Sequence, residues 1–138
     1  MNSRLVLLVE DDPTDAELIA QAVQDGRAPV RVVHVNDCAG ALRYLRSRPE
    51  RMPSLIMLSL NLPDRSGFRF LETIKADETW KAVPIVGLAE SSEQYDVSES
   101  FALGIAGYVV KSEDPARLRQ EIAMIRVYWT TNQLPRIV

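Results

Sequence analysis

Three acidic residues stand side by side after an apolar run near the start of the chain: Glu10, Asp11 and Asp12 follow "LVLLV". Lys111 follows a second apolar run, "GYVV", and Ser59 follows a third, "SLIML". Carboxylate oxygens bind hard divalent cations, and Mg²⁺ needs only one or two carboxylates when a phosphate group completes its shell. An acidic cluster that faces a lysine is therefore a candidate site for Mg²⁺ and an anionic group, if the fold brings these residues together.

The apolar runs before these residues are three of five segments with the length and β-branched composition of buried strands. The five segments cover residues 5–9, 30–35, 54–58, 84–88 and 107–110. Helical patterns cover about 12–26, 37–46, 67–76, 91–103 and 114–129. Nearly continuous apolar strands that alternate with helices predict an α/β fold, a doubly wound five-stranded parallel sheet with five helices. Ligands of such folds bind outside the carboxyl ends of the strands, so the acids, Ser59 and Lys111 are expected at one crevice.

Local signals mark the ends of the first helix and the start of the last. Asp12 precedes Pro13, which is the typical order of an N-cap and a first helical residue, and capping alone is enough to account for Asp12. The first helix is therefore expected between Asp12 and Gly26, and Asp114 and Pro115 open the last helix in the same way. The apolar stripe of the last helix consists of Leu118, Ile122, Ile125 and Trp129.

Length and charge exclude several classes of protein. A chain of 138 residues predicts one domain over 1–138, with a core at about 3–127 and a C-terminal extension at about 128–138. The formal net charge of −3, with both signs mixed, leaves no basic face for nucleic acid. The apolar runs are too short for a signal peptide or a membrane span, so a cytoplasmic location without membrane contact is expected. The one cysteine, Cys38, is expected as a small buried residue.

Four stretches resemble the signature regions of response-regulator receiver domains: "LLVEDDPTDAELI", "LIMLSLNLPDRSGFRFLETIKAD", "PIVGLAESSE" and "GIAGYVVKS". They align over nearly the whole chain. The "NLP" turn and the stretch "VYWTTNQLP" are similar to single-domain receivers that accompany bacterial phytochromes. The resemblance implies the receiver (flavodoxin-like) fold with strand order 2-1-3-4-5, a role in two-component (phosphorelay) signal transduction, and no enzymatic activity.

Five positions agree with the pattern of that family. The resemblance places Glu10 and Asp11 as the magnesium-binding acids and Asn61 as the residue whose backbone carbonyl completes the metal site. It places Lys111 at the lysine that meets the phosphoryl group, and Tyr108 at the aromatic residue whose orientation reports activation.

Two positions depart from the pattern. Ser59 occupies the place of the aspartate that accepts the phosphoryl group, and Ala89 occupies the place of the conserved hydroxyl residue. An aspartate is an anion at neutral pH, whereas a serine hydroxyl needs a neighbouring base to attack phosphorus. The site has also lost one anionic ligand for a cation. We therefore expect an atypical receiver, a pseudo-receiver that requires no cofactor and binds Mg²⁺ weakly or not at all.

Without phosphorylation, function is expected to come from protein–protein interaction. The resemblance implies an output or dimer face over the fourth helix, fifth strand and fifth helix, continued by the aromatic tail. The expected interface residues are Phe101, Tyr108, Ile122, Tyr128, Trp129 and Leu134. The implied partners are a histidine kinase of phytochrome type, another response regulator, or a second copy of the chain in a homodimer.

Two alternatives remain open at this point. Ser59 is the acceptor of a serine kinase in the first, which requires an accessible hydroxyl. In the second, Ser59 is the nucleophile of a hydrolase with Lys111 as its base. The second alternative is weaker, because no Gly-x-Ser-x-Gly turn surrounds Ser59.

Overall fold

The structure is a computed structural model that describes residues 4–26, 29–47, 52–90 and 94–131. Its strands are β1 (Arg4–Val9), β2 (Val30–Val35), β3 (Leu55–Ser59), β4 (Ile85–Ala89) and β5 (Gly107–Val110). Its helices are α1 (Pro13–Gln24), α2 (Cys38–Arg46), α3 (Ser66–Ala76), α4 (Gln94–Ala102) and α5 (Pro115–Thr131), with a short 3₁₀ turn η1 (Pro63–Arg65) before α3. No helix in the described parts of the chain has the length and apolar character needed to cross a bilayer.

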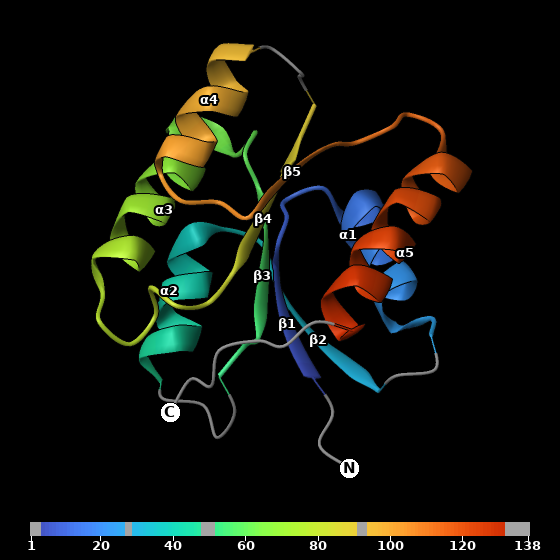
Figure 1. The fold of residues 1–138 in the computed structure, drawn as a ribbon, viewed down its shortest axis with the longest axis horizontal. Helices are drawn as coiled ribbons and strands as arrows, with labels where there is room; N and C mark the ends of the chain where they lie inside the picture. Colours follow the sequence, from blue (N-terminus) through green and yellow to red (C-terminus); the bar gives the residue numbers. More distant parts are fainter. Residues whose placement is uncertain (1–3, 27–28, 48–51, 91–93, 132–138) are drawn as a thin grey trace.

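The sheet has the order β2-β1-β3-β4-β5, and every neighbouring pair is parallel. Helices α1 and α5 cover one face, and α2, α3 and α4 cover the other (Figure 1). This arrangement confirms the predicted doubly wound α/β fold and its strand order. Because all five strands run in one direction, their carboxyl ends meet at one edge of the sheet.

The core consists of two apolar layers, one on each face of the sheet. Side chains of β1, β3 and β4 point alternately into the two layers, as the period of a strand requires. The layer under α1 and α5 contains Val6, Leu8, Ala16, Ile19, Leu55, Met57, Leu88, Leu118 and Ile122. The layer under α2 and α3 contains Leu7, Val9, Ala41, Leu45, Ile56, Leu58, Phe70, Leu71 and Ile74.

The first helix begins as the sequence predicts. The Asp12 carboxylate accepts hydrogen bonds from the backbone N–H groups of Thr14 (2.9 Å) and Asp15 (3.0 Å), which satisfies two of the helix's free donors. Pro13 occupies the first turn, where no donor is needed. This cap fixes the direction of the first turn of α1 over the end of β1, and with it the position of Asp15.

The last helix differs from the sequence prediction in where it ends and in which of its residues are buried. Helix α5 continues to Thr131, so the C-terminal extension does not begin at 128. Trp129 is 3% exposed and its ring N–H donates to the carbonyl of Ser54 (3.3 Å), while Ile122 is fully buried. Ile122 and Trp129 therefore belong to the core of the protomer and not to an interface, because the predicted apolar stripe of α5 faces the sheet. Leu134 lies outside the described residues.

Candidate functional site

The candidate site lies where the carboxyl ends of β1, β3 and β5 meet. The Lys111 ammonium nitrogen, one residue beyond β5, lies 2.9 Å from the Oε1 atom of Glu10, which directly follows β1. The two side chains are only 6% and 1% exposed. The backbone of Glu10 is held by β2, since its N–H donates to Val35 (3.1 Å) and its carbonyl accepts from His34 Nε2 (2.8 Å). The sequence correctly placed Glu10 and Lys111 together.

Asp15 is a second partner of Lys111 that the sequence analysis missed. Its Oδ2 atom lies 3.1 Å from the Lys111 nitrogen, and its side chain is 32% exposed. Its position in the first turn of α1, three residues after the Asp12 cap, turns it toward the end of β1. That position was readable from the sequence, but nothing in the sequence indicated that Lys111 would reach it.

Burial and pairing shift the pKa values of this pair. Burial raises the pKa of Glu10, and the hydrogen bond and charge of Lys111 oppose the shift only in part. For Lys111, burial favours the neutral amine, but the hydrogen bonds and charges of Glu10 and Asp15 outweigh it and raise the pKa. Lys111 is therefore a firmly protonated cation, already neutralised by carboxylates of the protein itself.

Ser59 ends β3 and is 1% exposed. Its hydroxyl oxygen has no hydrogen-bond partner among the described residues. The chain after it packs tightly, because a Cβ on Gly67 would lie 3.0 Å from the Ser59 carbonyl oxygen. A serine kinase would find this hydroxyl inaccessible, so the structure speaks against that alternative.

The surroundings of Ser59 also speak against the hydrolase alternative. A general base must be unprotonated and must contact the hydroxyl that it activates. Lys111 is protonated, and it pairs with Glu10 and Asp15 rather than with Ser59. No group in the described chain activates Ser59 by a hydrogen bond.

The residues expected to hold Mg²⁺ are Glu10, Asp11 and Asn61, and the weak Mg²⁺ site stays a prediction. Glu10 is committed to Lys111, and Asp11 is exposed at the surface. The Asn61 side chain accepts a hydrogen bond from the backbone N–H of Glu90 (2.7 Å), which ties the loop after β3 to the loop after β4. No group of three acidic, histidine or cysteine side chains with metal-binding spacing exists in the described residues. Mg²⁺ would have to compete with Lys111 for Glu10.

Ala89 and Tyr108 lie together at the ends of β4 and β5. Ala89 is 2% exposed, Tyr108 is half-buried, and both line a cavity of about 330 Å³. Further out, Phe101 on α4 and Tyr128 on α5 are 48% and 72% exposed. Of the expected interface residues, Phe101, Tyr108 and Tyr128 are thus accessible.

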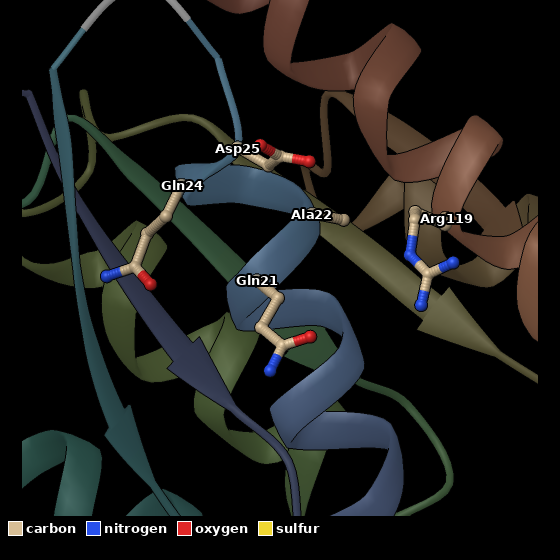
Figure 2. A pocket seen from close by; sticks show the side chains of 5 residues that line it. All are labelled: Gln21, Ala22, Gln24, Asp25 and Arg119. Carbon is tan, nitrogen blue, oxygen red and sulfur yellow. The ribbon is translucent and has the colours of Figure 1, made fainter.

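Another hollow, of about 600 Å³, lies away from this site between α1 and α5 (Figure 2). The Arg119 side chain extends from α5 beside the last turn of α1, which contributes Gln21, Ala22, Gln24 and Asp25. These side chains mix both signs of charge with neutral amides. The hollow contains none of the residues that the sequence analysis selected.

The comparisons with known proteins agree with the fold. The family model of the response regulator receiver domain matches residues 6–123. The response regulator Rcp1 of Synechocystis is 29% identical over 130 residues, which cover 91% of this chain and 88% of Rcp1. The chain belongs to the response-regulator receiver family of two-component signalling.

Two solved structures show how close the likeness is. The phosphorylated cyanobacterial phytochrome response regulator RcpA superposes with a TM-score of 0.91 at 34% identity, covering 98% of this chain and 100% of RcpA. The Mn²⁺-bound form of Rcp1 superposes with a TM-score of 0.88 at 30% identity, covering 96% and 99%. The protein is therefore similar to phytochrome-associated response regulators, as the sequence predicted.

Proposed function

We propose that this protein is a receiver that has lost phosphorylation at position 59 and signals through protein–protein contacts alone. It acts in the cytoplasm in two-component signalling, as a binding partner and not as an enzyme, and requires no cofactor. Its proposed partners are a phytochrome-type histidine kinase or another response regulator. The similarity to RcpA and Rcp1 supports the phytochrome connection.

The observation that carries this proposal is the closed charge network at the carboxyl edge of the sheet. Lys111, which would meet a phosphoryl group in the family, is paired with Glu10 at 2.9 Å and Asp15 at 3.1 Å. Ser59 is buried and offers a neutral hydroxyl in place of a carboxylate. A phosphoryl group would therefore find no nucleophile, and its usual cation is already neutralised.

We further propose that the protein forms a homodimer through the face around Phe101, Tyr108 and Tyr128. Exposed aromatic side chains on one face are typical of interfaces, where they supply much of the binding energy. Phe101 and Tyr128 expose 48% and 72% of their surface, and Tyr108 lies on β5 between their helices. A symmetric dimer would bury each patch against its copy.

The test measures the affinity of the purified chain for a phytochrome-type histidine kinase, before and after the kinase has been autophosphorylated with ATP. The dissociation constant of the natural chain is expected to be the same in both states. The control is the Ser59→Asp, Ala89→Thr double variant, which regains the family's acceptor and hydroxyl and is expected to respond to ATP. A complex of the natural chain that forms or dissociates only with the phosphorylated kinase would contradict the proposal. The absence of any complex would rule out such kinases as the partner.

A further inference from the structure

The cavity beside Ala89 has the size and composition of a ligand pocket. It measures about 330 Å³ and lies between the loop after β3, the ends of β4 and β5, and α4. Its lining residues are Leu60, Asn61, Leu62, Asp64, Arg65, Phe68, Ala89, Asp96 and Tyr108. Pockets for small ligands begin at about this volume and combine apolar walls with a few polar groups.

The inner wall of the cavity is apolar and aromatic. Ala89 and Leu62 are 2% and 4% exposed, and the rings of Phe68 and Tyr108 stand beside them. A threonine or serine at position 89 would place a hydroxyl group in this wall. The alanine leaves a methyl group, which offers space and no hydrogen bond.

The outer wall of the cavity is negatively charged. Asp64 and Asp96 both line it, and within the described chain neither carboxylate has an ion pair or a hydrogen bond. Arg65, the one cation among the described lining residues, is neutralised by Glu99 on α4, with 2.6 Å between the charged atoms. Two uncompensated carboxylates repel an anion and attract a cation.

The protein itself already places one guanidinium group at this wall. The Cζ atom of Arg65 lies 4.2 Å from the centroid of the Phe68 ring, which is a favourable cation–π distance. The same guanidinium is paired with the Glu99 carboxylate. Arg65 thus shows that an aromatic face and a carboxylate around this cavity can hold a cation together, and Tyr108 with Asp96 offers a second such combination.

We propose that this cavity binds a cationic group, a guanidinium or a primary ammonium on a short apolar stem, with Asp64 and Asp96 as its counter-ions and Tyr108 and Ala89 as its apolar wall. The source of the cation is a free small molecule or the basic side chain of a partner protein. This inference does not depend on the proposed function, and either can fail without the other.

The test is a titration followed by ¹H–¹⁵N NMR on the full chain, read at the backbone amides of Phe68, Ala89 and Tyr108. The cationic probes are acetyl-arginine amide and n-butylguanidine, which carry one positive charge each, and the neutral control is acetyl-citrulline amide, which has nearly the shape of the first probe without its charge. The cations are expected to shift these three signals to saturation, and the citrulline probe is expected to leave them unchanged. Tighter binding of acetyl-arginine amide than of n-butylguanidine assigns the site to a protein side chain, and the reverse order assigns it to a free small molecule.

Substitutions in the cavity lining test whether the probes bind at this site. Asp64→Asn and Asp96→Asn are each expected to weaken binding about threefold, and together about tenfold, as expected for partly exposed ion pairs. Ala89→Leu fills the cavity and is expected to abolish binding, and its dispersed NMR spectrum checks that the chain still folds. Glu72→Gln, an exposed acid on α3 away from the cavity, is the matched control and is expected to bind like the natural chain. No saturable shift, equal binding of the neutral probe, or unchanged affinity in the double aspartate variant would each overturn the proposal.

Discussion

The ammonium group of Lys111 lies 3.1 Å from the carboxylate of Asp15, although the two residues are 96 positions apart in the sequence. With Glu10 at 2.9 Å, the lysine bridges the end of β1, the first turn of α1 and the loop after β5. The resemblance to the family places Lys111 at the lysine that meets the phosphoryl group. Here the protein supplies both of its anionic partners.

Removal of the Lys111 ammonium group should cost more stability than removal of the charge of its partly exposed partner Asp15. Lys111→Met would leave the carboxylate of Glu10, which is 1% exposed, without its cation, and is expected to lower the free energy of unfolding by about 3 kcal/mol. Asp15→Asn breaks a partly exposed pair and should cost about 1 kcal/mol. Urea unfolding at neutral pH measures both. Glu17→Gln, at an exposed position of α1, is the control and should stay within about 0.5 kcal/mol of the natural chain. A Lys111→Met variant as stable as this control would refute the network.

The same pair predicts how stability depends on pH. The pKa of Glu10 in the folded protein lies above its ordinary value of 4.5, so between these two values the folded state binds more protons than the unfolded state. The free energy of unfolding contributed by Glu10 therefore falls as the pH rises through this window. Lys111 limits the rise in the pKa of Glu10, so this pKa should be higher still in Lys111→Met. Glu10 is then more often protonated and uncharged at about pH 5 than at about pH 7, and the stability lost in Lys111→Met should be smaller at the lower pH. Urea midpoints of both proteins at the two pH values test the sign, and an equal loss at both would contradict it.

Cys38 should be unreactive in the folded protein. Burial raises the pKa of its thiol from 9.0 to about 11, and the side chain is 8% exposed. At about pH 8 the thiolate fraction is then about 100-fold below that of an unshifted thiol. Alkylation by iodoacetamide should accordingly be at least that much slower in buffer than in concentrated urea, and its rate should keep rising above pH 9. Comparable rates in the folded and unfolded protein would show that the thiol is accessible.

The dimer face can be tested at a single exposed side chain. Tyr128 is 72% exposed on α5, so Tyr128→Glu should leave the fold intact and place a charge in the proposed interface. Sedimentation is expected to show the mass of two chains for the natural protein and of one chain for the variant. Glu17→Lys, on the exposed side of α1, changes charge without touching that face and should remain dimeric. A natural chain that sediments as a monomer would contradict the proposed homodimer.

Local patterns were enough to predict the fold. The apolar runs that end at Val9 and Leu58 are strands because each is buried on both faces, and the pair Asp12 and Pro13 opens α1 because a cap and a fixed φ angle act on the nearest residues. These signals depend on neighbours in the sequence. The order of the strands came from resemblance to the family.

The parts that the sequence did not predict depend on distant contacts. In the sequence, Asp15 looks like an ordinary acidic residue in the first turn of a helix. Lys111 reaches it only because the folded sheet places the end of β5 beside that turn. In the sequence, Trp129 belongs both to the apolar stripe of the last helix and to the aromatic tail. Its contact with Ser54 shows that it packs against the sheet with the rest of the stripe. The cavity beside Ala89 requires five elements, η1, α3, β4, α4 and β5, to converge and has no signature in any one of them.

The most direct measurement of the central claim is the intact mass of the protein after incubation with a small acyl-phosphate donor and Mg²⁺. The natural chain is expected to keep its mass, because Ser59 is buried without a base and Lys111 is held by Glu10 and Asp15. The Ser59→Asp, Ala89→Thr double variant, treated in parallel, is expected to gain one phosphoryl group. A phosphoryl group on the natural chain that maps to Ser59 or to a neighbouring acid would contradict the account and restore the phosphorylation switch.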